Sequence, residues 1–283
     1  MNSEQRIAVV TGASSGVGYE TALSLARAGW RVVALGRNEA RMARSAAAIA
    51  EAAPEATVDW IRADLSVIAE MREAARAIAA KTDRIDVLIN NAGQILGERF
   101  ETPDGLEQTF AGNVLAPFLM TGELLPQLHA SARPHVITTA SIGHSYIDDM
   151  VWDDLQLENG FSGGRAYLQS KLANILFARE LAARHPELVS SSIHPGNVDS
   201  NFVDTADQHT KAYFEEATKK GELVTPAQGA DTLVWLAQDI ARALPSGGYF
   251  SERERIDPSP AACNAASAER LWTICEDLTG TRY

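Results

Sequence analysis

The sequence predicts an α/β fold in which parallel strands form one sheet and helices cover both of its faces. Short apolar runs alternate with longer stretches of helical periodicity from the first residues onward. Strands in such an alternation are joined by right-handed crossovers and lie parallel to one another. We find no repeat, low-complexity segment or linker in the 283 residues, so we expect a single domain over residues 1–283.

The expected strands are short apolar runs, about seven in number. The first of them, RIAVVTG, has the continuous apolar character of a strand that is buried on both faces. The runs occupy residues 6–12, 31–36, 57–64, 85–93, 135–141 and 188–196, with a last short one at 247–251. Together they predict a Rossmann-like, doubly wound sheet.

The expected helices fill the intervals between these runs. The first, SSGVGYETALSLARAGW, ends at Gly29, because glycine favours the C-terminal end of a helix. Ser66 is expected to cap the helix after the third strand, with Asp64 just ahead of it. Further helices are expected at residues 38–53, around 106–130, from 166 onward and over the closing stretch 267–280.

The alternation breaks at two places, residues 142–164 and 199–224. Both segments are polar and irregular, and both leave the C-terminal end of an expected strand. Ligands of open parallel sheets bind at that edge. We therefore expect these two segments to surround a substrate.

Composition and charge exclude several functions. A formal net charge of −12 would repel nucleic acid and anionic membranes. Two cysteines without a CxxC motif or Cys/His cluster provide neither a disulfide framework nor a structural zinc site, so no metal is expected. The sequence has no signal-peptide pattern and no run of eighteen apolar residues, so we expect a cytoplasmic protein without a membrane span.

A glycine-rich turn, VVTGASSGVG, lies between the first strand and the first helix. Gly12, Gly16 and Gly18 do not have the GxGxxG spacing, but they meet the same demands. These are a tight turn, close approach of the backbone to a pyrophosphate, and close packing of the helix on the sheet. The helix N-terminus would then face phosphate. The alternative is a glycine-rich turn without a ligand.

The end of the second strand, LGRNEAR, indicates which dinucleotide binds. Gly36 stands where an NAD enzyme would carry an acid for the ribose 2′-hydroxyl, and Arg37 follows it. A guanidinium can hold a 2′-phosphate with paired hydrogen bonds. This pattern favours NADP(H) over NAD(H). Alternatively, Arg37 only begins a solvated helix together with Arg41 and Arg44.

In the stretch AYLQSKLANILF, Tyr167 and Lys171 stand four residues apart and so lie on one face of a helix. The spacing by itself also fits an ordinary buried helix whose apolar face is formed by leucine and isoleucine. A free tyrosine has a pKa of about 10 and is a slow proton donor near neutral pH. An ammonium one turn away favours the phenolate, so we expect Lys171 to lower the pKa of Tyr167.

Six motifs occur in a fixed order and make the sequence resemble the short-chain dehydrogenase/reductase family over nearly the whole chain, from Ile7 to about Gly280. They are TGASSGVG, NNAG, Asn113, TTAS ending at Ser141, YLQSK and HPGNV. Three longer stretches, among them GGYFSERE, are most similar to the branch that contains retinol dehydrogenases and protochlorophyllide reductases. The 26 positions between Ser141 and Tyr167 are consistent with an inserted substrate loop.

The resemblance implies a set of cofactor-binding residues. The glycine turn would hold the phosphates, the end of the third strand the adenine, NNAG the ribose, and HPGNV the nicotinamide. Ser200 stands where relatives often have a threonine. The implied residues are Gly12, Ser14, Ser15, Gly16, Val17, Gly18, Arg37, Asp64, Leu65, Asn91, Ala92, Gly93, Tyr167, Lys171, Pro195, Gly196, Val198 and Ser200.

The resemblance also implies the catalytic roles. Tyr167 would exchange a proton with the substrate oxygen, and Lys171 would tune that proton and bond the ribose. Ser141 would hold the substrate oxygen, and Asn113 would complete a relay to Lys171. Taken singly, Ser141 could be a turn cap, Asn113 a buried amide at a helix kink before Pro117, and Tyr167 an aromatic at the rim.

Two residues of the first irregular segment, His144 and Tyr146, are candidates to line the substrate pocket, although His144 could also be a plain loop residue. The four aspartates that follow form either a solvated acidic loop or a site for a cation. They are Asp148, Asp149, Asp153 and Asp154.

We therefore expect an NADP(H)-dependent oxidoreductase that acts on a carbonyl or alcohol. The alternative is a redox-inactive, cofactor-binding sensor on the same fold. Because residues 199–222 are mostly polar, a medium-sized ketone or alcohol fits better than a retinoid. A homodimer through the helices of Asn113 and Tyr167 is one possibility, and a monomer is the other.

Overall fold

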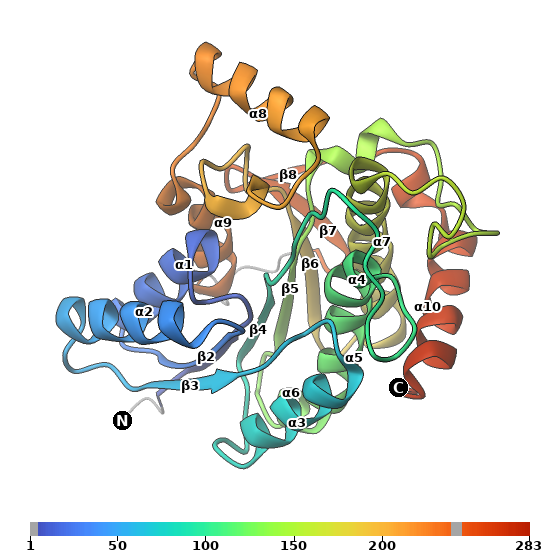
Figure 1. Cartoon of the computed structure of the whole chain (residues 1–283). Helices are drawn as coiled ribbons and strands as arrows, with labels where there is room; N and C mark the ends of the chain where they lie inside the picture. Colours follow the sequence, from blue (N-terminus) through green and yellow to red (C-terminus); the bar gives the residue numbers. More distant parts are fainter. Residues whose placement is uncertain (1–4, 239–244) are drawn as a thin grey trace.

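One eight-stranded sheet runs through the molecule (Figure 1). This computed structural model describes residues 5–238 and 245–283. The strand order is β3-β2-β1-β4-β5-β6-β7-β8, and only β8 pairs antiparallel. The strands are β1 (Ile7–Val10), β2 (Arg31–Gly36), β3 (Val58–Arg62), β4 (Val87–Asn90), β5 (His135–Thr139), β6 (Val189–Ile193), β7 (Gly248–Ser251) and β8 (Glu254–Ile256).

The seven expected strands are all present, and β8 is an addition. It is three residues long and returns from β7 through Glu252 and Arg253, whose φ angles are 51° and 62°. Positive φ at both central residues is the pattern of a type I′ hairpin turn, which glycine and asparagine usually supply. Because neither residue occurs there, the sequence carries no hairpin signal.

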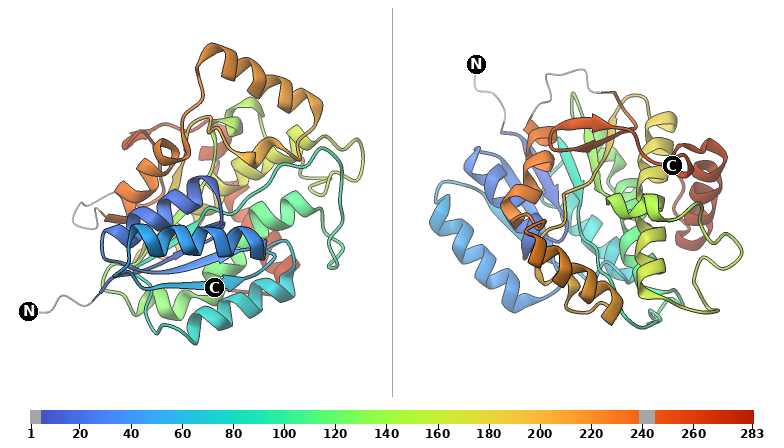
Figure 2. Two further views of the ribbon diagram at one scale, coloured as in Figure 1. Left: turned by 60° about the vertical axis from the view of Figure 1, so that its left-hand side comes forward. Right: turned by 90° about the horizontal axis from the view of Figure 1, so that it is seen from above.

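Helices cover both faces of the sheet (Figures 1 and 2). On one face lie α1 (Gly16–Arg27), α2 (Glu39–Ala52) and α9 (Pro226–Gln238). On the other lie α3 (Ile68–Ala79), α4 (Gln108–Phe110), α5 (Ala116–Glu123), α6 (Leu125–His129) and α7 (Gly163–Arg184), with α10 (Ala265–Thr279) packed on α7. Among the described residues, no helix combines the length and apolar character that a bilayer span needs.

The apolar core has two parts, one on each face of the sheet, because side chains alternate along each strand. Val9 and Val33 pack into the cluster beneath α3, α5 and α7. Their neighbours Ala8 and Val32 pack into the cluster beneath α1 and α9. This two-sided burial explains why the strands are continuous apolar runs in the sequence.

The segment 199–224 is not irregular, contrary to the sequence expectation. It contains a 13-residue helix, α8 (Gln208–Lys220), which crosses above the C-terminal edge of the sheet (Figure 1). Asp207 caps this helix by accepting a hydrogen bond from Thr210 N at 2.7 Å, and Gly221 ends it with φ 68°. These are ordinary start and stop signals that the polar composition of the segment obscured.

Two further helical details differ from the expectation. Ser66 does not cap α3, because both its N–H and its hydroxyl donate to Asp64 Oδ1, at 3.0 and 2.7 Å. Asp104 Oδ2 instead accepts from Ile68 N, at 2.9 Å. The stretch around 106–130 is also not one helix but α4, a π-helical turn at Ala111–Leu115, α5 and α6.

Candidate active site

A cleft of about 1040 Å³ opens at the C-terminal edge of the sheet, between the strand ends and α8. Every residue predicted above to bind cofactor or to act in catalysis lines this cleft. Of the two substrate candidates, Tyr146 lines it and His144 does not. The tertiary structure therefore brings together residues that are up to about 190 positions apart in the chain.

The glycine turn has the backbone conformation that only glycine adopts without strain. Gly12 and Gly16 have φ angles of 70° and 56°. A Cβ on Gly18 would lie 2.3 Å from the Gly12 carbonyl oxygen, so α1 packs directly on the turn. Ser15, the N-cap of α1, makes no side-chain cap bond, and the first turn of α1 carries no acid. Its N–H groups and the positive end of its dipole are thus available to a phosphate.

The end of β2 has no space for a carboxylate. A Cβ on Gly36 would lie 2.8 Å from Met42 Cγ and 3.0 Å from Ser14 Cβ. Arg37 is half exposed at the rim of the cleft, and its Nη1 atom lies 3.5 Å from both Asp64 Oδ2 and Gln94 Oε1. These distances are at the limit for hydrogen bonds, so its other donors can bind an anion. The residues present therefore fit a phosphorylated dinucleotide.

Tyr167 and Lys171 lie on one face of α7 as predicted, with Lys171 Nζ 5.4 Å from the centre of the tyrosine ring. Nζ donates to the Thr139 carbonyl oxygen at 2.9 Å, and Lys171 is only 4% exposed. Burial lowers the pKa of Lys171 to about 8, because desolvation disfavours the ammonium form.

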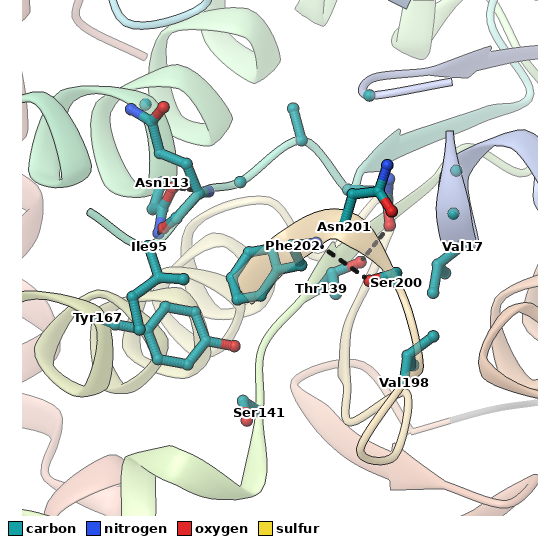
Figure 3. Close-up of a pocket in the computed structure, with 18 of the residues that line it drawn as sticks. Val17, Ile95, Asn113, Thr139, Ser141, Tyr167, Val198, Ser200, Asn201 and Phe202 are labelled. Carbon is teal, nitrogen blue, oxygen red and sulfur yellow. Dashed lines mark hydrogen bonds between the residues drawn. The ribbon is translucent and has the colours of Figure 1, made fainter. Parts of the chain in front are cut away.

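The pKa of Tyr167 shifts in the direction opposite to the one expected from Lys171. Burial of the hydroxyl raises the pKa of Tyr167 to about 12, and a hydrogen bond with Ser141 only partly opposes this rise. The effect of desolvation on the Tyr167 pKa outweighs that of the Lys171 ammonium, because Nζ of Lys171 is directed at a backbone carbonyl. Figure 3 shows the hydroxyl of Tyr167 pointing into the cleft, on the side of Ser141.

Ser141 combines the two roles that the sequence left open. Its Oγ atom accepts from Gly143 N at 3.1 Å and so caps a short 3₁₀ helix, Ile142–Tyr146. The same hydroxyl interacts with that of Tyr167 and partly opposes the rise of its pKa.

Asn113 lies in the π-helical turn, fully buried, and its side-chain amide joins two segments. It exchanges two 2.9 Å hydrogen bonds with the backbone of Gln94 and donates to Ser170 Oγ at 3.1 Å. Ser170 Oγ in turn donates to the Tyr167 carbonyl oxygen at 2.7 Å. Pro117 has no N–H for the Asn113 carbonyl, which explains the wider helical turn. In the described structure, this amide connects the loop after β4 to the helix of Tyr167.

The loop after β6 forms the opposite wall. Gly196 has φ 87°, and Val198 forms a parallel bridge with Val224. Ser200 Oγ accepts from Phe202 N at 3.4 Å, which starts the 3₁₀ turn that carries the Phe202 ring over the cleft (Figure 3).

His144 is a structural residue, which corrects its assignment to the pocket. It is 1% exposed, its Nδ1 atom lies 2.7 Å from the Ser141 carbonyl oxygen, and its Nε2 atom lies 3.0 Å from Ser259 N. A carbonyl can only accept and a backbone N–H can only donate, so the ring is the neutral Nδ1–H tautomer. Burial also lowers its pKa. His144 thus joins the backbone of Ser141 to the C-terminal loop.

Replacing His144 by alanine should lower the free energy of unfolding by about 2–4 kcal/mol, because two buried partners lose their hydrogen bonds. The folded-state pKa of His144 is lowered, so its stabilising effect is complete above the ordinary histidine pKa and decreases as the pH falls below it. Urea unfolding at pH 8 and pH 5 measures both effects. His209→Ala, on exposed α8, is the control and should change stability by less than about 0.5 kcal/mol. Equal losses in the two variants would contradict the assignment.

Sequence reasoning missed the apolar wall of the cleft. Phe202, Tyr213 and Phe214 all line it, and the Phe202 ring centre lies 5.3 Å from that of Tyr167. The segment 199–222 is polar on average, but α8 presents its aromatic residues to the cleft. Helical periodicity would have revealed this. The composition argument against an apolar ligand therefore does not hold.

The acidic loop remains outside the cleft. None of its four aspartates lines the cavity. Asp154 accepts from the N–H groups of Glu158 and Asn159 at 2.8 and 2.9 Å, and Asp149 accepts from Met150 N at 2.8 Å. These contacts organise the turns of the loop and favour the solvated interpretation.

The parallel sheet, the glycine turn after β1 and the tyrosine–lysine pair beside it define the class of nicotinamide-dependent α/β oxidoreductases. The model of the short chain dehydrogenase family matches residues 6–211, so the chain belongs to the short-chain dehydrogenase/reductase family, whose members act on alcohols and carbonyls.

Similar proteins agree with this membership and with the retinol dehydrogenase branch. A protein of Streptomyces sp. (strain C5) assigned as a daunorubicin C-13 ketoreductase, DnrU, is 36% identical over 97% of this chain and 93% of its own. Human retinol dehydrogenase 12 is 35% identical over 98% of this chain and 87% of its own. The solved RhlG/NADP active-site complex of Pseudomonas aeruginosa has a TM-score of 0.69 and 28% identity, over 86% of this chain and 93% of that one.

Proposed function

We propose that this protein is an NADP(H)-dependent oxidoreductase that interconverts a ketone or aldehyde with the corresponding alcohol, and that Tyr167 is its general acid and base. The observation that carries the proposal is the convergence of Tyr167, Ser141 and Lys171 on the cleft that the glycine turn also lines. A redox-inactive sensor would not need these three side chains together.

The bound cofactor supplies the hydride in reduction and accepts it in oxidation. Ser141 holds the substrate oxygen by a hydrogen bond, which orients the carbonyl carbon. Tyr167 gives its proton to that oxygen as it becomes an alkoxide and takes the proton back in the reverse direction. The raised pKa of Tyr167 keeps the phenol protonated near neutral pH, which suits reduction. Asn113 holds the helix of Tyr167 in place through Ser170.

Two observations support NADP(H) over NAD(H). The crowded Cβ position of Gly36 leaves no place for the carboxylate that would bond a ribose 2′-hydroxyl. Arg37 has guanidinium donors at the cleft, where Asn38 and Arg41 also lie. The structural neighbour named above as an NADP complex is consistent with this choice.

Replacing Arg37 by aspartate should weaken the binding of NADPH about 100-fold or more and change the binding of NADH far less. The charge-assisted hydrogen bonds to the 2′-phosphate are lost, and a carboxylate of like charge takes their place. Fluorescence titration with both cofactors measures the effect. Arg44→Asp is the matched control, since Arg44 is exposed on α2 and outside the cleft. A native preference for NADH would contradict the proposal.

Hydride transfer to a panel of ketones, aldehydes and alcohols tests the function itself. Ketones with an apolar ring system are the first choice, because Phe202, Tyr213 and Phe214 give the substrate side aromatic walls. Consumption of NADPH that depends on such a substrate supports the reductase. Tight NADPH binding without turnover of any substrate would favour the sensor.

A further inference from the structure

A second cluster of polar side chains lies at the edge of the sheet opposite the cleft. His129 is the last residue of α6, His185 follows the end of α7, and Glu187 stands just before β6. Their ligand atoms all lie within 4.8 Å of one another. None of the three lines the cleft, and none has a part in the proposed reaction.

Two imidazole nitrogens converge on one carboxylate oxygen. Glu187 Oε1 lies 2.8 Å from His129 Nε2 and 2.9 Å from His185 Nδ1. In a tetrahedral zinc site, metal–ligand bonds of about 2.1 Å place the ligand atoms about 3.4 Å apart, about half an ångström more than these two distances. A cation placed among these three atoms therefore needs little rearrangement.

The surroundings favour a cation at this position. α7 is 22 residues long and has His185 as its C-cap, so the negative end of its dipole faces the cluster. Arg184, which precedes His185 in the chain, is engaged by Glu180 at 2.7 Å and stacks over Trp272, so it does not neutralise Glu187.

The three ligands are also held by buried neighbours. Leu128, Leu181 and Leu188, adjacent to the ends of these segments, are buried. His185 is further fixed by its backbone N–H, which donates to Leu181 O at 2.9 Å. Ligands on such fixed supports need little ordering on binding.

We propose that His129, His185 and Glu187 form a binding site for one divalent transition-metal ion of the zinc type, which joins the ends of α6 and α7. The two imidazole protons that bond Glu187 move to the other ring nitrogens, and water completes the coordination. Two nitrogen ligands select such an ion over magnesium and calcium, which prefer oxygen.

Calorimetric titration of tag-free full-length protein with zinc chloride tests the site. One zinc ion per chain is expected, together with a higher melting temperature, and magnesium should have neither effect. H129Q and E187Q should each weaken zinc binding about tenfold or more. E73Q, which removes an exposed carboxylate on α3 away from the cluster, is the control and should bind zinc normally. Because His129 and Glu187 are largely exposed, these variants should fold, and circular dichroism checks that they do.

The absorption spectrum of bound cobalt(II) shows which kinds of atom ligate the metal. A cobalt complex with nitrogen and oxygen ligands should lack the thiolate charge-transfer band that binding at the exposed Cys263 would produce. A thiolate band, or zinc affinity unchanged in the H129Q/E187Q double variant, would overturn the proposal. This outcome is independent of reductase activity, since no substrate or nicotinamide is present in either experiment.

Discussion

Tyr167→Phe should lower kcat for ketone reduction by about 10²–10⁴-fold, the usual contribution of a positioned general acid. The substitution removes only the hydroxyl, so the ring should keep its contact with Phe202, whose centre lies 5.3 Å away. Cofactor affinity should therefore change only slightly. Steady-state kinetics together with fluorescence titration of NADPH separates the two effects.

Tyr19→Phe is the matched control for this experiment. Tyr19 lies on α1, packs against the core cluster beneath α1 and α9, and does not line the cleft. Its substitution should leave kcat within about twofold, since no hydroxyl in the cleft is lost. If Tyr167→Phe also retained full turnover, the assignment of Tyr167 as the acid would be wrong.

Lys171→Met should remove most activity and at the same time stabilise the protein when no cofactor is present. The ammonium is buried at a cost that lowers its pKa from 10.5 to about 8. A methionine of similar shape avoids this cost, and Asn174 Nδ2 still donates to the Thr139 carbonyl, at 3.1 Å. The gain in the free energy of unfolding should be about 1–3 kcal/mol.

The pH dependence of this gain follows from the direction of the shift. A lysine whose folded pKa is lowered destabilises the fold below that pKa, where the charged form must be buried. The cost disappears as the pH rises from about 8 towards the ordinary lysine pKa. Lys171→Met should therefore stabilise the protein more at pH 7 than at pH 10, in urea unfolding. Lys219→Met, on exposed α8, should have almost no effect at either pH, and the same result for Lys171 would refute the argument.

Local signals in the sequence were sufficient for most of the fold. The central strands β1, β2 and β4 are buried on both faces, so each appears as an apolar run whatever its partners are. The turn with Gly12 and Gly16 was predictable because positive φ is a local demand of the backbone. The i, i+4 spacing of Tyr167 and Lys171 placed both on one face of α7 for the same reason.

The features that sequence reasoning missed depend on contacts between distant segments. His144 became a structural residue because Ser259, more than a hundred positions away, donates to its second nitrogen. The aromatic wall exists because α8 folds back over the strand ends. The mostly polar composition of α8 does not indicate which of its residues face the cleft.

The sequence by itself determined the order of the strands β1 to β7 and of most helices, the glycine turn and the residue types of the proposed site, because periodicity and backbone conformation are properties of adjacent residues. Only the tertiary structure decided the electrostatic state of that site. Desolvation depends on what surrounds a group from all sides, so the pKa of Tyr167 rises although its lysine neighbour alone would lower it. The convergence of His129, His185 and Glu187 was likewise invisible until three segment ends met at one edge of the sheet.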